Sequence, residues 1–296
     1  MIIRTTNVGP EAAFQSAGYV LFVEGHDQDS IDPTVLRELL RGEIEVEPFG
    51  PSSNIKSAAE AFYRQHQTYC FLIDRDHYDD ETVDQYWKAF PDSTTSNLLI
   101  WRRREMENYF LIPEYLARSA FISVSEDELR ALILKCCNER LYLDCANQVI
   151  IGIREEHKNI WIKKYENLDG FRTKDAALSN LLENPALLGR KKYVGETVHP
   201  SELEKRFEQI LYEMTGGKEP LEYDQGEWLK LLPGKEVFNV VGNQCFKVKD
   251  GQGRNLQGRD KIKEVAKELV RKPLIDQPND FQELYRLISN MIDRAK

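Results

Sequence analysis

The sequence lacks the features that place a protein in a membrane or hold it together by disulfides. No run of ~18 apolar residues occurs, so we expect no transmembrane helix. The first residues contain no apolar core of signal-peptide length. The five cysteines are an odd number without a Cys-x-x-Cys pair, which argues against a disulfide framework or a zinc site. We therefore expect a cytoplasmic protein that makes no membrane contact.

A nucleotide-binding P-loop is also missing. The glycine-rich segment GQGRNLQG (251–258) is not followed by Lys-Ser or Lys-Thr, as a Walker A loop would be. Any ATP hydrolysis linked to this chain must then come from a partner. We interpret Gly242–Gly258 as a flexible loop or hairpin by default. The alternative is a contact to nucleic acid through the basic residues in and after it, which are Lys247, Lys249, Arg254, Arg259 and Lys261.

Basic charge is scarce in the first part of the chain. Residues 1–120 contain 11 Lys and Arg against 20 Asp and Glu, a net charge of −9, which equals that of the whole 296-residue chain. A protein that coats nucleic acid would normally be basic. A metal-dependent phosphate enzyme can be acidic, because bound cations offset its carboxylates. The composition disfavours a structural nucleic-acid binder and leaves a metallonuclease open.

Short apolar runs alternate with helical patterns over residues 1–118. Tyr19–Val23, Glu43–Pro48, Tyr69–Ile73 and Asn97–Trp101 have the residue types of strands, and Pro33–Leu40, Ser57–Arg64 and Asp80–Phe90 have helical spacing. This order predicts an α/β fold with a parallel sheet covered by helices on both faces.

The pattern changes beyond residue 118. Ser125-Glu126-Asp127-Glu128 forms a capping box before a helical pattern that runs to about residue 154, and a helix also starts after His199. Further helices are predicted over Asp260–Arg271 and Asp280–Ala295. We expect two domains, an α/β domain over 1–118 and a mostly helical domain over 119–296 that contacts substrate or partner.

Three of the predicted strands are followed by acidic residues. Glu24 ends the first strand, Asp74 and Asp76 follow the third, and Glu107 follows the fourth. Ligands of open α/β sheets collect outside the carboxyl ends of the strands. Residues two apart on an extended chain share a face, so Asp74 and Asp76 can converge on one ion. Hard cations such as Mg²⁺ prefer oxygen ligands and assist phosphoryl chemistry.

Each of these residues also has a plain structural interpretation. Glu24 can be a turn residue, and the two aspartates can belong to a solvated acidic turn. Glu107, like the alternative Glu105, can pair with the arginines that precede it. These are Arg102, Arg103 and Arg104, an ion-paired surface run by default, or a grip on the phosphate backbone if a metal site lies beside them.

The arrangement YVLFVEG, helix, strand, GPSSNIKSAAEAF and YCFLIDRDH resembles the TOPRIM fold of topoisomerases, primases and OLD-family nucleases. REMENYFLIP (Arg104–Pro113) resembles the sequence that follows in OLD-like nucleases and in the TOPRIM effectors of PARIS anti-phage systems. The TOPRIM resemblance covers about residues 19–113, and PGKEVF (Pro233–Phe238) extends the effector resemblance. Relatives often carry an Asp four residues after the first Glu, where this chain has Gln28 between Asp27 and Asp29; whether either of these joins the site stays open.

The resemblance implies a function and roles for the residues. Glu24 would act as general acid/base or metal ligand, Asp74 and Asp76 would hold Mg²⁺ (or Mn²⁺), and Glu107 would complete the site. The implied activity is an endonuclease that cleaves RNA such as tRNA, or DNA. The implied partner is an ABC-type ATPase that restrains the toxic effector, and a homo-oligomer such as a dimer is expected.

Two other functions compete with the nuclease. A non-catalytic subunit could dock on an ATPase, although a pure scaffold has no physical need for clustered carboxylates that repel one another. A phosphatase or phosphorelay domain with Asp74 as nucleophile would need an Asp at the end of the first strand, where Glu24 stands.

Overall fold

The computed structural model describes residues 18–62, 65–76, 78–91, 97–158, 179–180 and 182–293. The chain divides into two compact units. Unit 1 consists of residues 1–137 together with 229–296, and unit 2 consists of residues 138–228. This division differs from the boundary expected between residues 118 and 119, because the last part of the chain returns to the α/β unit instead of staying with the helical insertion.

Unit 1 is built on a four-stranded parallel sheet, as the sequence predicted. The strand order is β2-β1-β3-β4, so the first and third strands lie side by side at the centre. Val20 pairs with Tyr69 and Val23 with Leu72 in the β1–β3 register. The strands are β1 (Val20–Val23), β2 (Glu45–Pro48), β3 (Tyr69–Ile73) and β4 (Leu98–Ile100).

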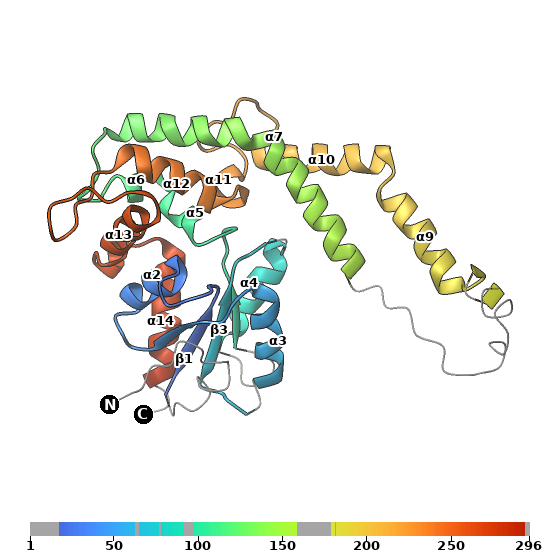
Figure 1. The fold of residues 1–296 in the computed structure, drawn as a ribbon, viewed down its shortest axis with the longest axis horizontal. Coiled ribbons are helices and arrows are strands. Elements are labelled where there is room, and N and C mark those ends of the chain that lie inside the picture. The colour runs from blue at the N-terminus through green and yellow to red at the C-terminus, as the bar shows by residue number, and fades with distance from the viewer. Residues whose placement is uncertain are drawn as a thin grey trace. The chain divides into compact units, whose positions relative to one another are not determined.

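Helices cover both faces of this sheet (Figure 1). Right-handed crossovers place α3 and α4 on one face and α2 on the other, where α14 joins it. The Sγ of Cys70 on β3 lies 3.4 Å from the Sδ of Met291 on α14. The helices are α2 (Ile31–Leu39), α3 (Ser52–Phe62), α4 (Asp80–Ala89) and α14 (Asn279–Asp293).

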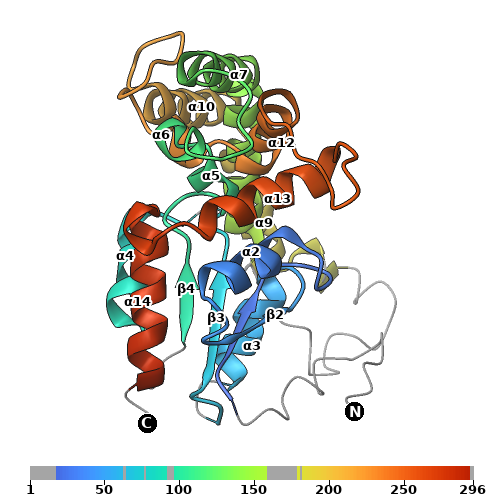
Figure 2. The same cartoon turned by 90° about the vertical axis from the view of Figure 1, so that its left-hand side faces the viewer.

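Several helices complete unit 1 above the carboxyl ends of the strands (Figure 2). One of them, α12, covers the first residues of the segment Gly242–Gly258, so that the expected loop begins only after Cys245. Helix α13 packs against both α2 and α12. These elements are α5 (Glu107–Phe110), α6 (Pro113–Leu116), α12 (Gly234–Cys245), α13 (Gly258–Val270) and the 3₁₀ helix η1 (Leu274–Asp276).

Unit 2 consists of helices packed side by side. The Sγ of Cys145 on α7 lies 3.6 Å from the Sδ of Met214 on α10, and Arg206 of α10 pairs with Glu156 of α7. The capping box of α7 forms as predicted, because the Glu128 carboxylate accepts the Ser125 N–H at 2.8 Å. The helices are α7 (Glu126–Lys158), which begins in unit 1, α9 (Pro185–Thr197), α10 (Pro200–Thr215) and α11 (Trp228–Leu231), which ends in unit 1.

No helix in the described ranges combines the length and the apolar character needed to cross a bilayer. The five cysteines are buried thiols and form no disulfide in the described part of the chain.

Candidate functional site

The carboxyl ends of β1 and β3 bring two of the predicted acids together. The backbone N–H of Asp74 donates a hydrogen bond of 3.0 Å to Oε1 of Glu24. This contact follows from the sheet, because β1 and β3 are parallel neighbours and each acid comes directly after its strand. Gly25 helps β1 to end sharply here, since its φ of +149° is one that side chains rarely adopt.

A cavity of about 520 Å³ opens beside these two acids. Glu24, Asp32 and Glu107 line it, together with the basic residues Lys235 and Arg259. The acids come from the end of β1, the first turn of α2 and the start of α5, and the basic residues come from α12 and α13. Residues from five separate elements of unit 1 therefore meet at one cavity.

Lys235 is the basic group in contact with the acids. Its Nζ lies 2.8 Å from Oδ2 of Asp74, and its backbone N–H donates to Glu105 at 2.7 Å. Burial lowers the pKa of Lys235, but the negative charges of Asp74 and Glu107 raise it by more, so the side chain stays an ammonium. One ammonium thus faces a larger number of carboxyl groups.

Two of the acids have buried oxygens that lack a hydrogen-bond partner. Oδ1 of Asp74 and both carboxyl oxygens of Glu107 are in this position within the described part of the chain. The exposed fraction is 5% for Asp74 and 1% for Glu107. A buried polar atom without a partner costs about 1–3 kcal/mol, and more when it is charged. These oxygens therefore have unused capacity to accept a hydrogen bond or to bind a cation.

The crowding of acids shows in their pKa values. Burial, followed by the charge of Asp74, raises the pKa of Glu24 to about 8 and that of Asp32 to about 7. Burial raises the pKa of Asp74 to about 6, against the opposing effect of Lys235. Burial and the charge of Asp32 raise the pKa of Glu107 well above its usual range. A cation bound among these groups would lower all four pKa values.

Asp76 lies nearby but differs from the other acids. Its side chain is exposed, and its backbone has a φ of +49°, which is uncommon for a residue other than glycine. The hydroxyl of Ser52 donates to Oδ2 of Asp76 at 3.3 Å. Burial is the main cause of the raised pKa of Glu24, and the charge of Asp76 adds to it. Asp74 is therefore the buried member of the Asp-x-Asp pair, and Asp76 is the exposed one.

The three consecutive arginines contact protein groups and do not line the cavity. Arg102 pairs with Asp280 at 2.8 Å and with Glu283 at 2.7 Å, and its guanidinium stacks over Trp87. Arg103 donates to the carbonyl oxygen of Leu229, and Arg104 to that of Leu231. These contacts are the ones expected if the arginines only pair with groups of the protein itself. Their predicted role in substrate binding stays a prediction.

Lys249 and Arg254 lie in the loop between α12 and α13. Both side chains are exposed, and Arg254 pairs with Asp250 at 2.8 Å. Asp27 and Asp29 belong to the turn after β1. Oδ1 of Asp27 accepts the Asp29 N–H at 3.0 Å, and Asp29 is 92% exposed, so neither carboxylate lines the cavity.

The sequence analysis missed Asp32 and Lys235. In the sequence, Asp32 is an ordinary acid in the first turn of α2, where the helix dipole favours a negative charge. In the structure it is buried, with an exposed fraction of 7%. Lys235 stands in the first turn of α12, where the dipole disfavours a cation. That unfavourable position was the one local signal for Lys235.

Carboxylate oxygens are the donors that hard cations prefer, and Glu107, whose two carboxyl oxygens lack partners, lines the cavity with Glu24 and Asp32. Within the described ranges, however, no three His, Cys, Asp or Glu side chains are arranged to hold one ion as they stand. Lys235 takes up one oxygen of Asp74 instead. Metal binding would therefore require side-chain movement around Lys235.

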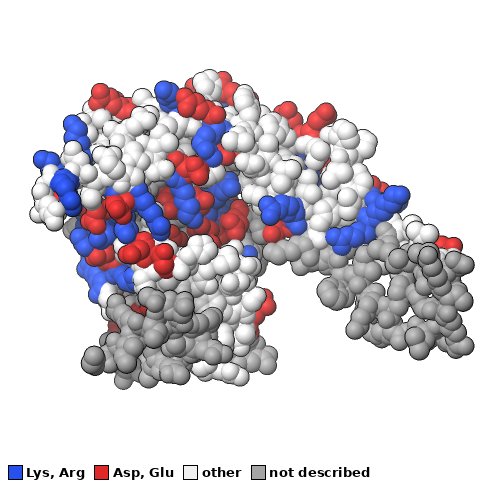
Figure 3. All heavy atoms as spheres, in the orientation of Figure 1, with Lys and Arg blue, Asp and Glu red and all other residues white. Residues whose placement is uncertain are grey.

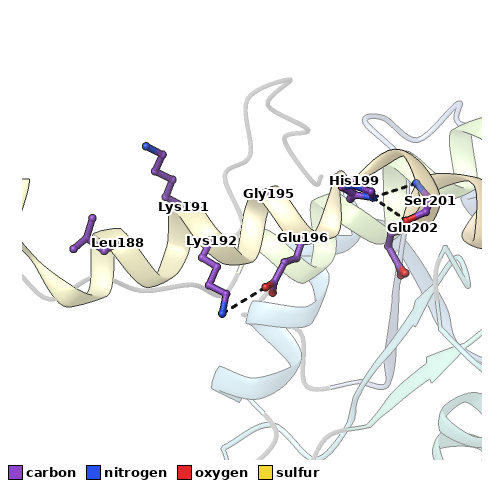
Figure 4. Close-up of a pocket in the computed structure, with 8 residues that line it drawn as sticks. All are labelled: Leu188, Lys191, Lys192, Gly195, Glu196, His199, Ser201 and Glu202. Atoms are coloured by element: carbon purple, nitrogen blue, oxygen red, sulfur yellow. Dashed lines mark hydrogen bonds and ion pairs between the residues drawn. The ribbon is translucent and has the colours of Figure 1, made fainter.

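A second hollow, of about 630 Å³, lies between α9 and α10 in unit 2. Lys192 pairs with Glu196 across one turn at 3.7 Å, and Nδ1 of His199 lies 2.8 Å from the hydroxyl of Ser201 (Figure 4). None of the predicted site residues lines this hollow.

The chain matches no protein-family model, no curated protein and no solved structure.

Proposed function

We propose that this chain is a metal-dependent endonuclease of the TOPRIM type that hydrolyses phosphodiester bonds in RNA, such as tRNA, or in DNA. The observation that carries the proposal is the meeting of Glu24, Asp74 and Glu107 at the carboxyl edge of the sheet, with buried oxygens that have no partner. The TOPRIM resemblance adds an anti-phage effector role under the restraint of a partner ATPase.

The residues divide the chemistry between them. Glu24, Asp74, Asp76 and Glu107 would hold Mg²⁺ or Mn²⁺, and Asp32 adds negative charge beside them. Bound there, the ion supplies positive charge that polarises the phosphate and lowers the pKa of attacking water. Lys235 lines the cavity and can donate to a phosphate oxygen when it leaves Asp74. Alternatively, Glu24 would serve as the general acid or base instead of a metal ligand: without a bound ion its pKa is about 8, so it can hold a proton at neutral pH and pass it to the leaving oxygen.

The test is cleavage by the purified full chain, with Mg²⁺ or Mn²⁺, on tRNA and on plasmid DNA. We expect cleavage that falls by about 10²-fold or more in Glu24→Gln, because the proton-transfer group is lost. Asp74→Asn should fall at least as far. Glu45→Gln, a change to an exposed acid on β2, is the matched control and should cleave like the wild type. Cleavage that survives both site substitutions would rule out the nuclease proposal.

One observation favours the alternative of a non-catalytic subunit that docks on an ATPase. Lys235 already neutralises Asp74 without any metal, as a purely structural ion pair would. The two functions differ in metal binding. Calorimetric titration with Mg²⁺ should show binding that Asp74→Asn abolishes if the site is catalytic, and no binding by the wild type if Lys235 is a permanent partner.

A further inference from the structure

A cavity lined by acids repels the substrate that the proposed function requires. A phosphodiester backbone carries one negative charge per nucleotide, and Lys235 alone must already balance Asp74. A nuclease with this cavity therefore needs a further cationic group at the point where the backbone enters. The three arginines of the sequence prediction do not lie there, since none of them lines the cavity.

Arg259 meets this requirement. It lies in the first turn of α13, lines the same cavity as Glu24 and Glu107, and is exposed to solvent. In the described part of the chain its guanidinium makes one hydrogen bond, to the carbonyl oxygen of Asp29 at 3.4 Å. That distance is long for an N–H···O bond, so little is lost when the guanidinium turns to another acceptor.

The position of Arg259 is fixed by the core beneath it. Helix α13 packs on α2 and α12, and Ile262, one turn further on, is 3% exposed and also lines the cavity. Lys263 reaches the same Asp29 carbonyl oxygen at 3.4 Å and so ties the turn after β1 to α13. The backbone of the arginine is thus held firmly while its side chain stays accessible.

Another arginine of the same helix provides the contrast. Arg271, the C-terminal cap of α13, holds both carboxylate oxygens of Glu38, at 2.6 and 2.9 Å. Two nitrogens of the Arg271 guanidinium are thus occupied by a protein carboxylate. The guanidinium of Arg259 is open to a phosphate, which can accept two parallel hydrogen bonds in the same way. Arg259 and Arg271 carry the same charge on the same helix. Comparing their substitutions therefore distinguishes a local contact at the cavity from an effect of the net charge of the protein.

More basic side chains continue from Arg259 into the loop that precedes α13. Lys247, Lys249 and Arg254 are exposed there, and Lys and Arg gather at the left edge of the molecule over this loop (Figure 3). A nucleic-acid strand that leaves the cavity past Arg259 would meet them next. Lys261, by contrast, is 5% exposed and points to backbone carbonyls, so it is excluded from this surface.

We propose that Arg259 binds the phosphodiester backbone of a nucleic acid at the mouth of the carboxylate cavity. The inference rests on the proposed function for its biological meaning, but binding can be measured without cleavage. A guanidinium can hold two phosphate oxygens at once, so recognition is by charge and geometry and not by base.

The experiment measures fluorescence anisotropy of a labelled RNA and a labelled DNA oligonucleotide, with the full chain in chelator, over a series of salt concentrations. For Arg259→Ala we expect about tenfold weaker binding and a salt dependence shallower by about 0.7, the value of one single-strand phosphate contact. Arg259→Lys should keep the salt dependence and recover part of the affinity. Arg271→Ala should bind like the wild type.

Each other outcome overturns the inference. It fails if Arg259→Ala binds like the wild type, if Arg271→Ala weakens binding equally, or if the wild type binds neither oligonucleotide. The two oligonucleotides separate RNA from DNA as the source of the backbone. A wild type that binds through Arg259 yet cleaves nothing would refute the nuclease proposal and leave this inference standing.

Discussion

Several buried charged residues of this protein lower the stability of its folded state. Glu107 and Asp74 have oxygens without partners, and Lys235 stands where the dipole of α12 opposes it. A fold selected only for stability would replace such groups with apolar ones. Violations of local rules that gather at one cavity are typical of functional sites, and here they coincide with the predicted carboxylates.

Lys261 shows what a buried charge does when it serves the fold. Its Nζ donates to the carbonyl oxygens of Asn243 and Phe246, at 3.0 and 3.1 Å, and so caps the end of α12. Lys261→Met should lower the free energy of unfolding by about 1.5–3 kcal/mol, since hydrogen bonds from a charged donor are lost. Urea denaturation measures this change.

Lys267→Met is the matched control on the same helix. Lys267 pairs with Glu264 at 2.7 Å, one turn away on α13. Such helix pairs are worth about 0.3–0.5 kcal/mol, so the control should barely change the unfolding free energy. Equal losses in the two variants would mean that Lys261 has no special capping role.

At the scale of elements, the sequence predicted the sheet well because its signals are local. Tyr69–Ile73 is a strand with the predicted bounds. Strands β1 and β2 begin one and two residues later than predicted, and β4 is one residue shorter at each end. Glu24 and Asp74 could be expected at the same edge because the carboxyl ends of parallel strands meet there. That β1 and β3 are direct neighbours was not predicted, and the structure shows it.

The rest of the site was out of reach because it depends on distant packing. Helix α12 was not predicted, since Gly234 at its start and Gly242 within it are poor helix formers. Lys235 and Arg259 reach the cavity through helices more than 120 residues beyond the sheet. No local pattern reports which acid such a residue will face.

The contact between α5 and α12 controls the geometry of the site. A Cβ on Gly234 would lie 2.5 Å from Oδ1 and 2.6 Å from the backbone N of Asn108, which follows Glu107. Gly234→Ala should therefore push α12 away from α5 and separate Lys235 from Asp74. We expect a loss of about 1–3 kcal/mol in unfolding free energy and weaker Mg²⁺ binding in calorimetry.

Gly152→Ala tests whether that effect belongs to the contact. Gly152 lies inside α7, and a Cβ there would meet nothing within 4 Å. Alanine should stabilise this helix by up to about 1 kcal/mol, with Mg²⁺ binding unchanged. If Gly234→Ala were also harmless, α12 would have room to shift and the close packing would not set the site.

At the scale of the whole molecule, the last part of the chain completes the first. Residues 229–296 belong to unit 1 and bring in α12, α13 and α14 after the insertion of unit 2. The acid excess of residues 1–120 then meets basic residues from that returning segment at one cavity. The charge asymmetry along the sequence is therefore partly balanced in space.

The raised pKa values of the buried acids make the stability of the folded protein depend on pH, and the metal binding that we propose would add a second dependence. The pKa values of Glu24, Asp32 and Asp74 are raised to about 8, 7 and 6 in the folded protein, against about 4 in an unfolded chain. A carboxyl group with a raised pKa supports folding fully below the unfolded value and loses that contribution as pH rises through the folded value. In chelator, we expect the melting temperature to fall between pH 5 and 8.5 by about 4 °C or more, since 1 kcal/mol corresponds to roughly 2–4 °C for a chain of this size.

Mg²⁺ needs ionised carboxylates and binds only the folded site, so it should raise the melting temperature more at pH 8.5 than at pH 5.5. Glu24→Gln should flatten the pH dependence and reduce the Mg²⁺ effect, whereas an equal Mg²⁺ effect at both pH values would show that the ion binds elsewhere.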